Sequence, residues 1–105
     1  MRDTLPALEE TGAQIPLADI ARSRADFPAA RMSFHLELVC AGLTGLGALC
    51  LALGRAGLEL RSLRVGDAGR VSCVLAGDGT ADLTGLALDL PQVAALRRWT
   101  TQLEF

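Results

Sequence analysis

Residues 58–75 read LELRSLRVGDAGRVSCVL, and this stretch decides the fold. On both sides of residues 66–69 (GDAG), apolar residues alternate with polar ones, which is the period-2 pattern of a half-buried β-strand. Glycine and aspartate favour tight turns, so GDAG predicts a hairpin that sends the chain back antiparallel. Before the turn the alternation changes phase, and a bulge near Arg61 and Ser62 would keep all its apolar residues facing one core. These residues are Leu58, Leu60, Leu63 and Val65.

Upstream of the hairpin, the sequence predicts a strand and then a helix. From residue 33 to residue 40 the apolar residues alternate with polar ones, which predicts a first strand. Its inward positions are Phe34, Leu36, Leu38 and Cys40. After a loop at residues 41–45, apolar residues recur at helical spacing, and Gly57 is placed to end this helix in a left-handed conformation. The helical positions are Leu46, Leu49, Cys50 and Leu53.

Downstream of the hairpin, the sequence predicts a second helix and a last strand. Residues 77–79 (GDG) break the chain, Thr80 or Asp78 can cap the next helix, and Pro91 ends it. The apolar stripe of this helix is Leu83, Leu86, Ala87 and Leu90. Residues 98–105 alternate cleanly and predict a C-terminal strand. Its apolar-side positions are Trp99, Thr101, Leu103 and Phe105.

These elements give the order βαββαβ over residues 32–105, which predicts an α+β fold. The expected architecture is a ferredoxin-like sandwich, a four-stranded antiparallel sheet with two helices on one face. Residues 1–31 contain three prolines and dispersed charges, which predicts an N-terminal arm or linker with about one helical turn. At 105 residues the chain is long enough for one core only.

Composition excludes several classes of function. The net charge of -2 and an aromatic content of 4% argue against a nucleic-acid partner. Three cysteines without C-x-x-C spacing favour buried thiols in a reducing cytoplasm over a disulfide framework or a zinc site. Residues 38–54 are uncharged, but glycines interrupt them, so we expect no membrane span. His35 is the only histidine and has no catalytic partner in the sequence, so we expect no enzyme, metal or cofactor.

The glycine-rich segment at residues 39–60 (VCAGLTGLGALCLALGRAGLEL) resembles the dinucleotide fingerprint of flavin-binding Rossmann domains. That fingerprint needs three glycines in the turn and an acid for the ribose. Here Cys40 stands in the place of the first glycine, and Arg64 stands in the place of the acid. A dinucleotide-binding fragment is therefore the remote alternative.

A second resemblance spans residues 32–105 and is to the ACT-domain family, in particular the small regulatory subunits of acetolactate synthase. Residues 56–63 (AGLELRSL) match the family's phrase Arg-Gly-aromatic-Asn-Ile-Glu-Ser-Leu without a gap. Residues 90–96 (LPQVAAL) resemble its Leu-x-x-x-Val-x-x-Val pattern with altered spacing. Counting back through the helix from Gly57, the family's loop glycine falls on Thr44. The family's asparagine falls on Glu59.

The resemblance implies a regulatory, non-catalytic module in branched-chain amino-acid biosynthesis. It would form a homodimer and dock on the catalytic large subunit, which carries the cofactor itself. Apolar Val39 and Val74, on an otherwise polar sheet face, also favour dimerisation. The alternative is a stand-alone sensor that binds an amino-acid effector at the dimer interface. The ligand-binding residues that the resemblance implies are Gly42, Leu43, Thr44, Gly45, Leu46, Leu58, Glu59 and Leu60.

Overall fold

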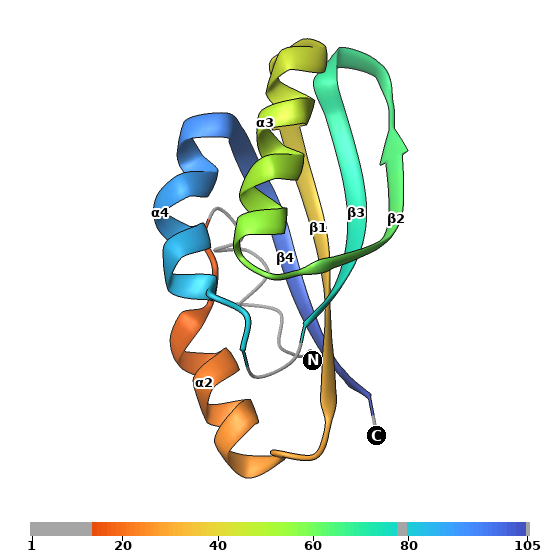
Figure 1. Ribbon diagram of the computed structural model, residues 1–105. Helices are drawn as coiled ribbons and strands as arrows, with labels where there is room; N and C mark the ends of the chain where they lie inside the picture. The colour runs from red at the N-terminus through yellow and green to blue at the C-terminus, as the bar shows by residue number, and fades with distance from the viewer. Residues whose placement is uncertain (1–13, 78–79, 105) are drawn as a thin grey trace.

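The computed structural model describes residues 14–77 and 80–104 of the chain. The elements in chain order are α2 (Leu17–Asp26), β1 (Arg31–Cys40), α3 (Gly42–Arg55), β2 (Glu59–Val65), a 3-10 turn (Asp67–Gly69), β3 (Arg70–Gly77), α4 (Leu83–Val93) and β4 (Ala94–Glu104). Figure 1 shows the helices packed against one face of a single twisted sheet.

The sheet has four strands in the order β2-β3-β1-β4, and each pair of neighbours is antiparallel. This is the α+β, ferredoxin-like arrangement that the sequence predicts, with β1 and β3 in the centre. β1 and β2 are separated by β3, so the strands on either side of α3 are not adjacent as they would be in a doubly wound sheet. Within the described residues, the opposite sheet face carries no helix, and we call it the open face.

The core lies between the sheet and its helices. β1 buries every second side chain from Met32 to Cys40 on the helical side, which confirms the alternation predicted for this strand. Phe34 packs against Trp99 of β4, with 5.1 Å between the ring centroids. Leu49 of α3 and Leu86 of α4 fill the space above them. The core is therefore built on β1, β3 and β4, and α3 and α4 cover it.

The hairpin and the bulge of β2 are both confirmed. The 3-10 turn at Asp67–Gly69 joins β2 to β3, and the register shifts between Leu60 and Ser62. The bulge does not, however, place the apolar residues of β2 in the core. Leu60, Leu63 and Val65 are 47%, 39% and 56% exposed. The reason is that α3 packs on β1, β4 and α4, so it leaves the helical side of this edge strand uncovered.

Both predicted helices exist, but their ends differ from the prediction. α3 begins at Gly42, inside the expected loop, and Gly57 follows it with a φ of 82°, as predicted. α4 is capped by Asp82, whose Oδ1 accepts a hydrogen bond from the backbone N–H of Gly85 at 2.9 Å, and not by Thr80. Asp78 lies outside the described residues. Pro91 does not end α4, because a proline two residues from the end of a helix removes only one backbone hydrogen bond.

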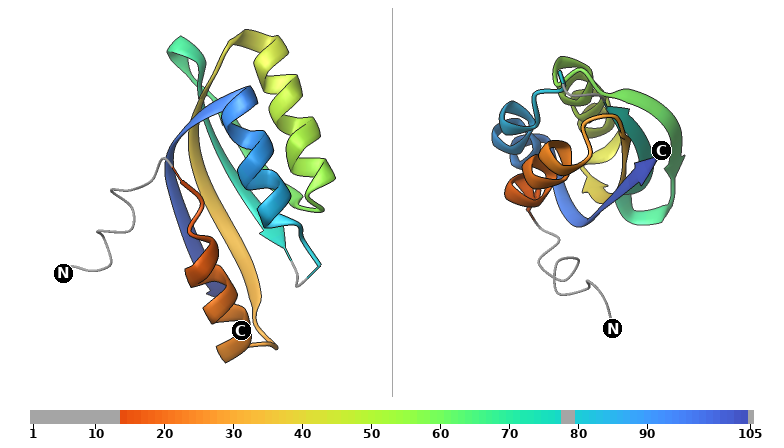
Figure 2. Two further views of the ribbon diagram at one scale, coloured as in Figure 1. Left: turned by 90° about the vertical axis from the view of Figure 1, so that its left-hand side faces the viewer. Right: turned by 90° about the horizontal axis from the view of Figure 1, so that it is seen from below.

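The N-terminal region contains more structure than the single helical turn that the sequence predicts. α2 is ten residues long, and its Ile20 is buried in the common core. Ile15 and Leu17 also pack against this core. α2 lies beyond the start of α4 and on the same face of the sheet (Figures 1 and 2). Residues 1–13 of the expected arm lie outside the described part of the chain.

The last strand is longer than predicted, because β4 starts directly after α4 at Ala94. Glu37 pairs with Arg98, and Leu38 pairs with Leu96, so Arg97 is an extra residue in β4. This bulge explains how Leu96 and Trp99, three positions apart, both face the core. Phe105 lies outside the described residues.

Candidate functional site

The residues implied as ligand-binding fall into two groups at opposite ends of α3. Residues 42–46 form the first turns of the helix, and residues 58–60 follow its other end. A helix of 14 residues is roughly 21 Å long. Within one chain, the structure therefore does not bring the two groups together (Figure 1).

The individual positions differ in how accessible they are. Leu43 is 84% exposed, and Thr44 is exposed beside it. Leu58 is buried in the core, so its side chain is part of the packing. Glu59 and Leu60 are exposed on β2. The accessible positions are therefore the first turn of α3 and the start of β2.

α3 is apolar on its solvent side as well as on its core side. Between Gly42 and Gly54 it carries no charged residue. Leu43 and Leu51 are 84% and 63% exposed, and Cys50 is exposed between them on the same side. A Cβ atom added at Gly47 or Gly54 would meet nothing within 4 Å. A helix that is apolar all round is normally buried, so this side needs a cover.

The edge strand β2 also exposes apolar side chains on the helical side of the sheet. β2 pairs with β3 on one side, and within the described residues no strand pairs with its other side. Its Leu60, Leu63 and Val65 face the helical side of the sheet and are exposed. We call Leu43 and Leu51 of α3, together with these three residues, the association surface. The sequence signal for it was the charge-free run at residues 42–54.

The open face of the sheet is polar, as predicted, and several of its side chains are paired. His35 Nε2 lies 3.0 Å from Ser72 Oγ. Val39 and Val74, the residues expected to favour dimerisation, are only partly exposed on this face. Larger exposed apolar side chains lie on the association surface, and Phe27 and Leu88 are exposed outside it.

One end of the open face is closed by an ion pair between the two edge strands. Arg61 of β2 and Glu104 of β4 approach to 3.3 Å between Nη1 and Oε1. Ser33 and Ala76, on the two central strands at this end, are 5% and 3% exposed. The sheet is therefore curled across its open face here, and its other end, near the 3-10 turn, stays open.

Within residues 14–77 and 80–104, no three or more His, Cys, Asp or Glu side chains are placed to hold a metal ion. Among the described residues, His35 contacts a serine hydroxyl and forms no ion pair with a carboxylate. In the same part of the chain, no helix has the length and apolar character needed to cross a membrane.

The three cysteines differ in their surroundings. Cys40 and Cys73 are buried, as predicted, but Cys50 is exposed, because α3 turns it away from the core. Burial raises the pKa of the Cys73 thiol to about 11, and it also raises the pKa of Cys40. The nearby Cys50 and, for Cys73, Cys40 add to the shift. Both buried thiols therefore stay protonated at neutral pH.

We expect one of the three cysteines to react with a thiol reagent in the folded protein. The thiolate is the reactive form, and Cys50 is the exposed one of the three cysteines. Mass spectrometry after brief treatment with iodoacetamide at pH 8 should find a single modification, at Cys50. The same treatment in urea should modify all three. Equal modification of Cys73 in the folded protein would contradict the burial of that strand.

In comparisons with models of protein families and with curated proteins, the chain matches none of them.

Proposed function

We propose that this protein is a non-catalytic, regulatory module that pairs with a second copy of itself and docks on a catalytic partner. The observation that carries the proposal is the association surface. Its leucines and valine are exposed on α3 and on the edge strand β2, and those of β2 lie on the same face of the sheet as the helix. Exposed apolar areas of this kind mark interaction sites in soluble proteins.

A second copy of the chain fits this surface for geometric reasons. An exposed strand edge offers unpaired N–H and C=O groups, which an identical edge can satisfy. A two-fold axis through the edge pairs β2 with the partner's β2 in antiparallel fashion and produces a self-complementary interface. The same axis places α3 against the partner's α3, also antiparallel. Gly47 and Gly54 allow the two helix backbones to approach closely.

Dimerisation in this manner would also reunite the two groups of implied ligand-binding residues. In an antiparallel pair of helices, residues 42–46 of one copy face the end of α3 in the other copy, where residues 58–60 begin. This arrangement supports the second candidate function, an amino-acid sensor whose pocket lies between protomers. Glu59 would place a negative charge in such a pocket, which disfavours the carboxylate of an amino acid. Docking is for this reason the preferred function.

The dimer can be tested with a pair of leucine substitutions. We expect Leu51→Glu to give a monomer, because it places a charge in the centre of an apolar interface. Leu88→Glu is the matched control. Leu88 is 70% exposed on α4, outside the association surface. Light scattering should show a dimer for the native chain and for Leu88→Glu only. A native monomer at high micromolar concentration, or a dimeric Leu51→Glu, would overturn the proposed arrangement.

Cys50 provides a second test of the helix pairing. It lies near the middle of α3 on the exposed side, close to where the two-fold axis would pass. A short bis-maleimide should therefore link two chains at Cys50, and the Cys50→Ser variant should give no linked species. The Leu51→Glu variant keeps Cys50 but is expected to be a monomer, so it should give less linked species. If it links as fully as the native chain, the linking arises from random collision.

The catalytic partner implied by the resemblance is the large subunit of acetolactate synthase. Mixing the chain with that subunit from the same organism should produce co-elution and a change in turnover or in feedback sensitivity. If neither co-elution nor a change in turnover or feedback sensitivity is seen, this partner is ruled out. A thermal-shift panel of the common amino acids separates the two candidate functions, since a ligand at a hundred times its Kd stabilises by about 2.7 kcal/mol. A flat panel favours docking.

A further inference from the structure

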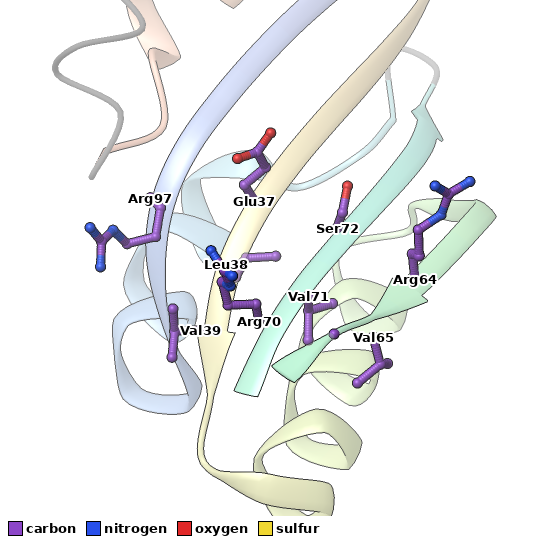
Figure 3. Close-up of a pocket in the computed structure, with 10 residues that line it drawn as sticks. Glu37, Leu38, Val39, Arg64, Val65, Arg70, Val71, Ser72 and Arg97 are labelled. Carbon is purple, nitrogen blue, oxygen red and sulfur yellow. The ribbon is translucent and has the colours of Figure 1, made fainter. Parts of the chain in front are cut away.

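The open end of the sheet's open face contains a cavity of about 510 Å³ beside the 3-10 turn. This volume lies within the range of small-molecule sites. Its lining comes from the three strands β1, β2 and β3 and from Arg97 of β4, and Val39 is the apolar lining residue whose side chain lies on the open face. Its polar side chains are Glu37, Arg64, Arg70, Ser72 and Arg97. Figure 3 shows these side chains on the strands that carry them.

The strand register brings two arginines to one serine. Arg64 of β2 is the direct cross-strand partner of Ser72, and Arg70 precedes Ser72 by two residues on the same face of β3. The Cβ atoms of cross-strand partners lie about 5 Å apart, and those of residues i and i+2 about 7 Å apart. Arginine side chains are long enough for both guanidinium groups to reach a ligand above the Ser72 hydroxyl. Among the described residues, neither Arg64 nor Arg70 has a recorded ion-pair partner.

Charge is concentrated at this end of the molecule. Arg64, Arg70, Arg97 and Arg98 meet a single carboxylate, Glu37, which gives the group a formal charge of +3 in a chain whose net charge is -2. Arg98 Nη1 lies 3.9 Å from Glu37 Oε2 and partly offsets that carboxylate. The bulge in β4 makes Arg97 and Arg98 available here together. The excess of cations is therefore a local property of the cavity.

We propose that this cavity binds a small organic phosphate, with Arg64, Arg70 and the Ser72 hydroxyl holding the phosphoryl group. Guanidinium groups match the geometry of phosphate oxygens and bind them through paired hydrogen bonds. Two unpaired guanidiniums suit a dianion better than a single carboxylate. The side chain of Val39, which lies on the open face opposite Arg70, provides apolar contact for the rest of the ligand. Arg64, Arg70 and Ser72 lie on the face of the sheet opposite α3, so the site needs no residue from a second copy.

The test compares three probes on the native chain at constant ionic strength: phenyl phosphate, inorganic phosphate and benzoate. Binding is measured by calorimetric titration. We expect phenyl phosphate to bind most tightly, inorganic phosphate more weakly and benzoate least, because only the first satisfies both the arginines and the apolar lining. No binding of either phosphate, or benzoate binding as tightly as phenyl phosphate, would overturn the proposal.

Substitutions locate the site. Arg64→Gln and Arg70→Gln should each weaken phenyl phosphate binding about tenfold or more, since a hydrogen bond to a charged group contributes roughly 1.5–3 kcal/mol. Arg31→Gln is the matched control, because Arg31 is also exposed on β1 but lies at the other end of the strand. Light scattering on the variants separates this proposal from the dimer, whose state should not change. Unchanged binding in Arg64→Gln and Arg70→Gln would overturn the assignment.

Discussion

Replacing Gly69 with alanine should destabilise the fold by about 2–5 kcal/mol, from left-handed backbone strain and overpacking together. Gly69 ends the 3-10 turn with a φ of 77°, a conformation that costs any residue with a side chain. A Cβ atom there would also overlap the backbone carbonyl oxygen of Cys40. That carbonyl ends β1, a central strand paired on both sides, so it cannot move away cheaply. Urea denaturation followed by circular dichroism measures the loss.

Gly66→Ala is the matched control for this prediction. Gly66 lies at the start of the same turn, but its φ is -115°, and the nearest atom to an added Cβ is 3.9 Å away. We expect this substitution to change the free energy of unfolding by less than about 1 kcal/mol. Equal destabilisation by both substitutions would mean that the turn does not press against the end of β1 as described.

Trp99→Ala should cost about 3–5 kcal/mol, as large-to-small substitutions of buried aromatic residues do. Trp99 is 2% exposed, and its ring packs against Phe34 at the centre of the core. Domains of this size are stable by only about 5–15 kcal/mol, so this variant is expected to unfold partly at 37 °C. Trp99→Phe keeps an aromatic ring in the cavity, and we expect it to remain folded with a smaller loss.

The hydrogen bond of Trp99 can be separated from its packing. The indole N–H donates to Thr101 Oγ1 at 2.9 Å. Thr101→Val removes the acceptor and keeps the shape, and its expected cost is about 1 kcal/mol, well below that of Trp99→Ala. Thermal unfolding of the three variants should rank them with Trp99→Ala the least stable. A loss in Thr101→Val as large as in Trp99→Ala would assign the stability to the hydrogen bond instead.

The parts of the fold that follow from local chemistry were predictable. The hairpin at residues 66–69 depends on turn residues next to one another, and the bulge of β2 follows from the change of phase after Leu60. The alternation of β1 is likewise visible in the sequence, because each face of a strand meets one environment. These features need no knowledge of distant contacts.

The missed features depend on packing between distant segments. α2 contributes only Ile20 as a fully buried residue, so its apolar signal is weak and its stability comes from the core that it contacts. Cys50 was placed inward because a helix without charges offers no polar side to orient it. The extra residue Arg97 interrupts the alternation of apolar and polar residues in β4. For this reason, the sequence pattern does not reveal the part of the strand before Arg98.

The candidate sites divide in the same way. Residues 42–46 and 58–60 come from opposite ends of one helix, and a single sequence does not show whether a second copy brings them together. The approach of Arg64 to Ser72, in contrast, could have been derived from the hairpin register alone. In the linear sequence, Arg64 stands out only as a departure from the dinucleotide fingerprint.

The uncovered edge of β2 has a consequence for how much of this protein a cell must make. In the proposed dimer, two copies would cover one another only when they meet, so by mass action the covered fraction would rise with total concentration. At low abundance, the backbone groups of β2 and the side chains of Leu60, Leu63 and Val65 are offered to any extended segment of another protein. If the proposed dimer forms, a low cellular concentration of the protein therefore favours misassembly with other proteins more than a high concentration does.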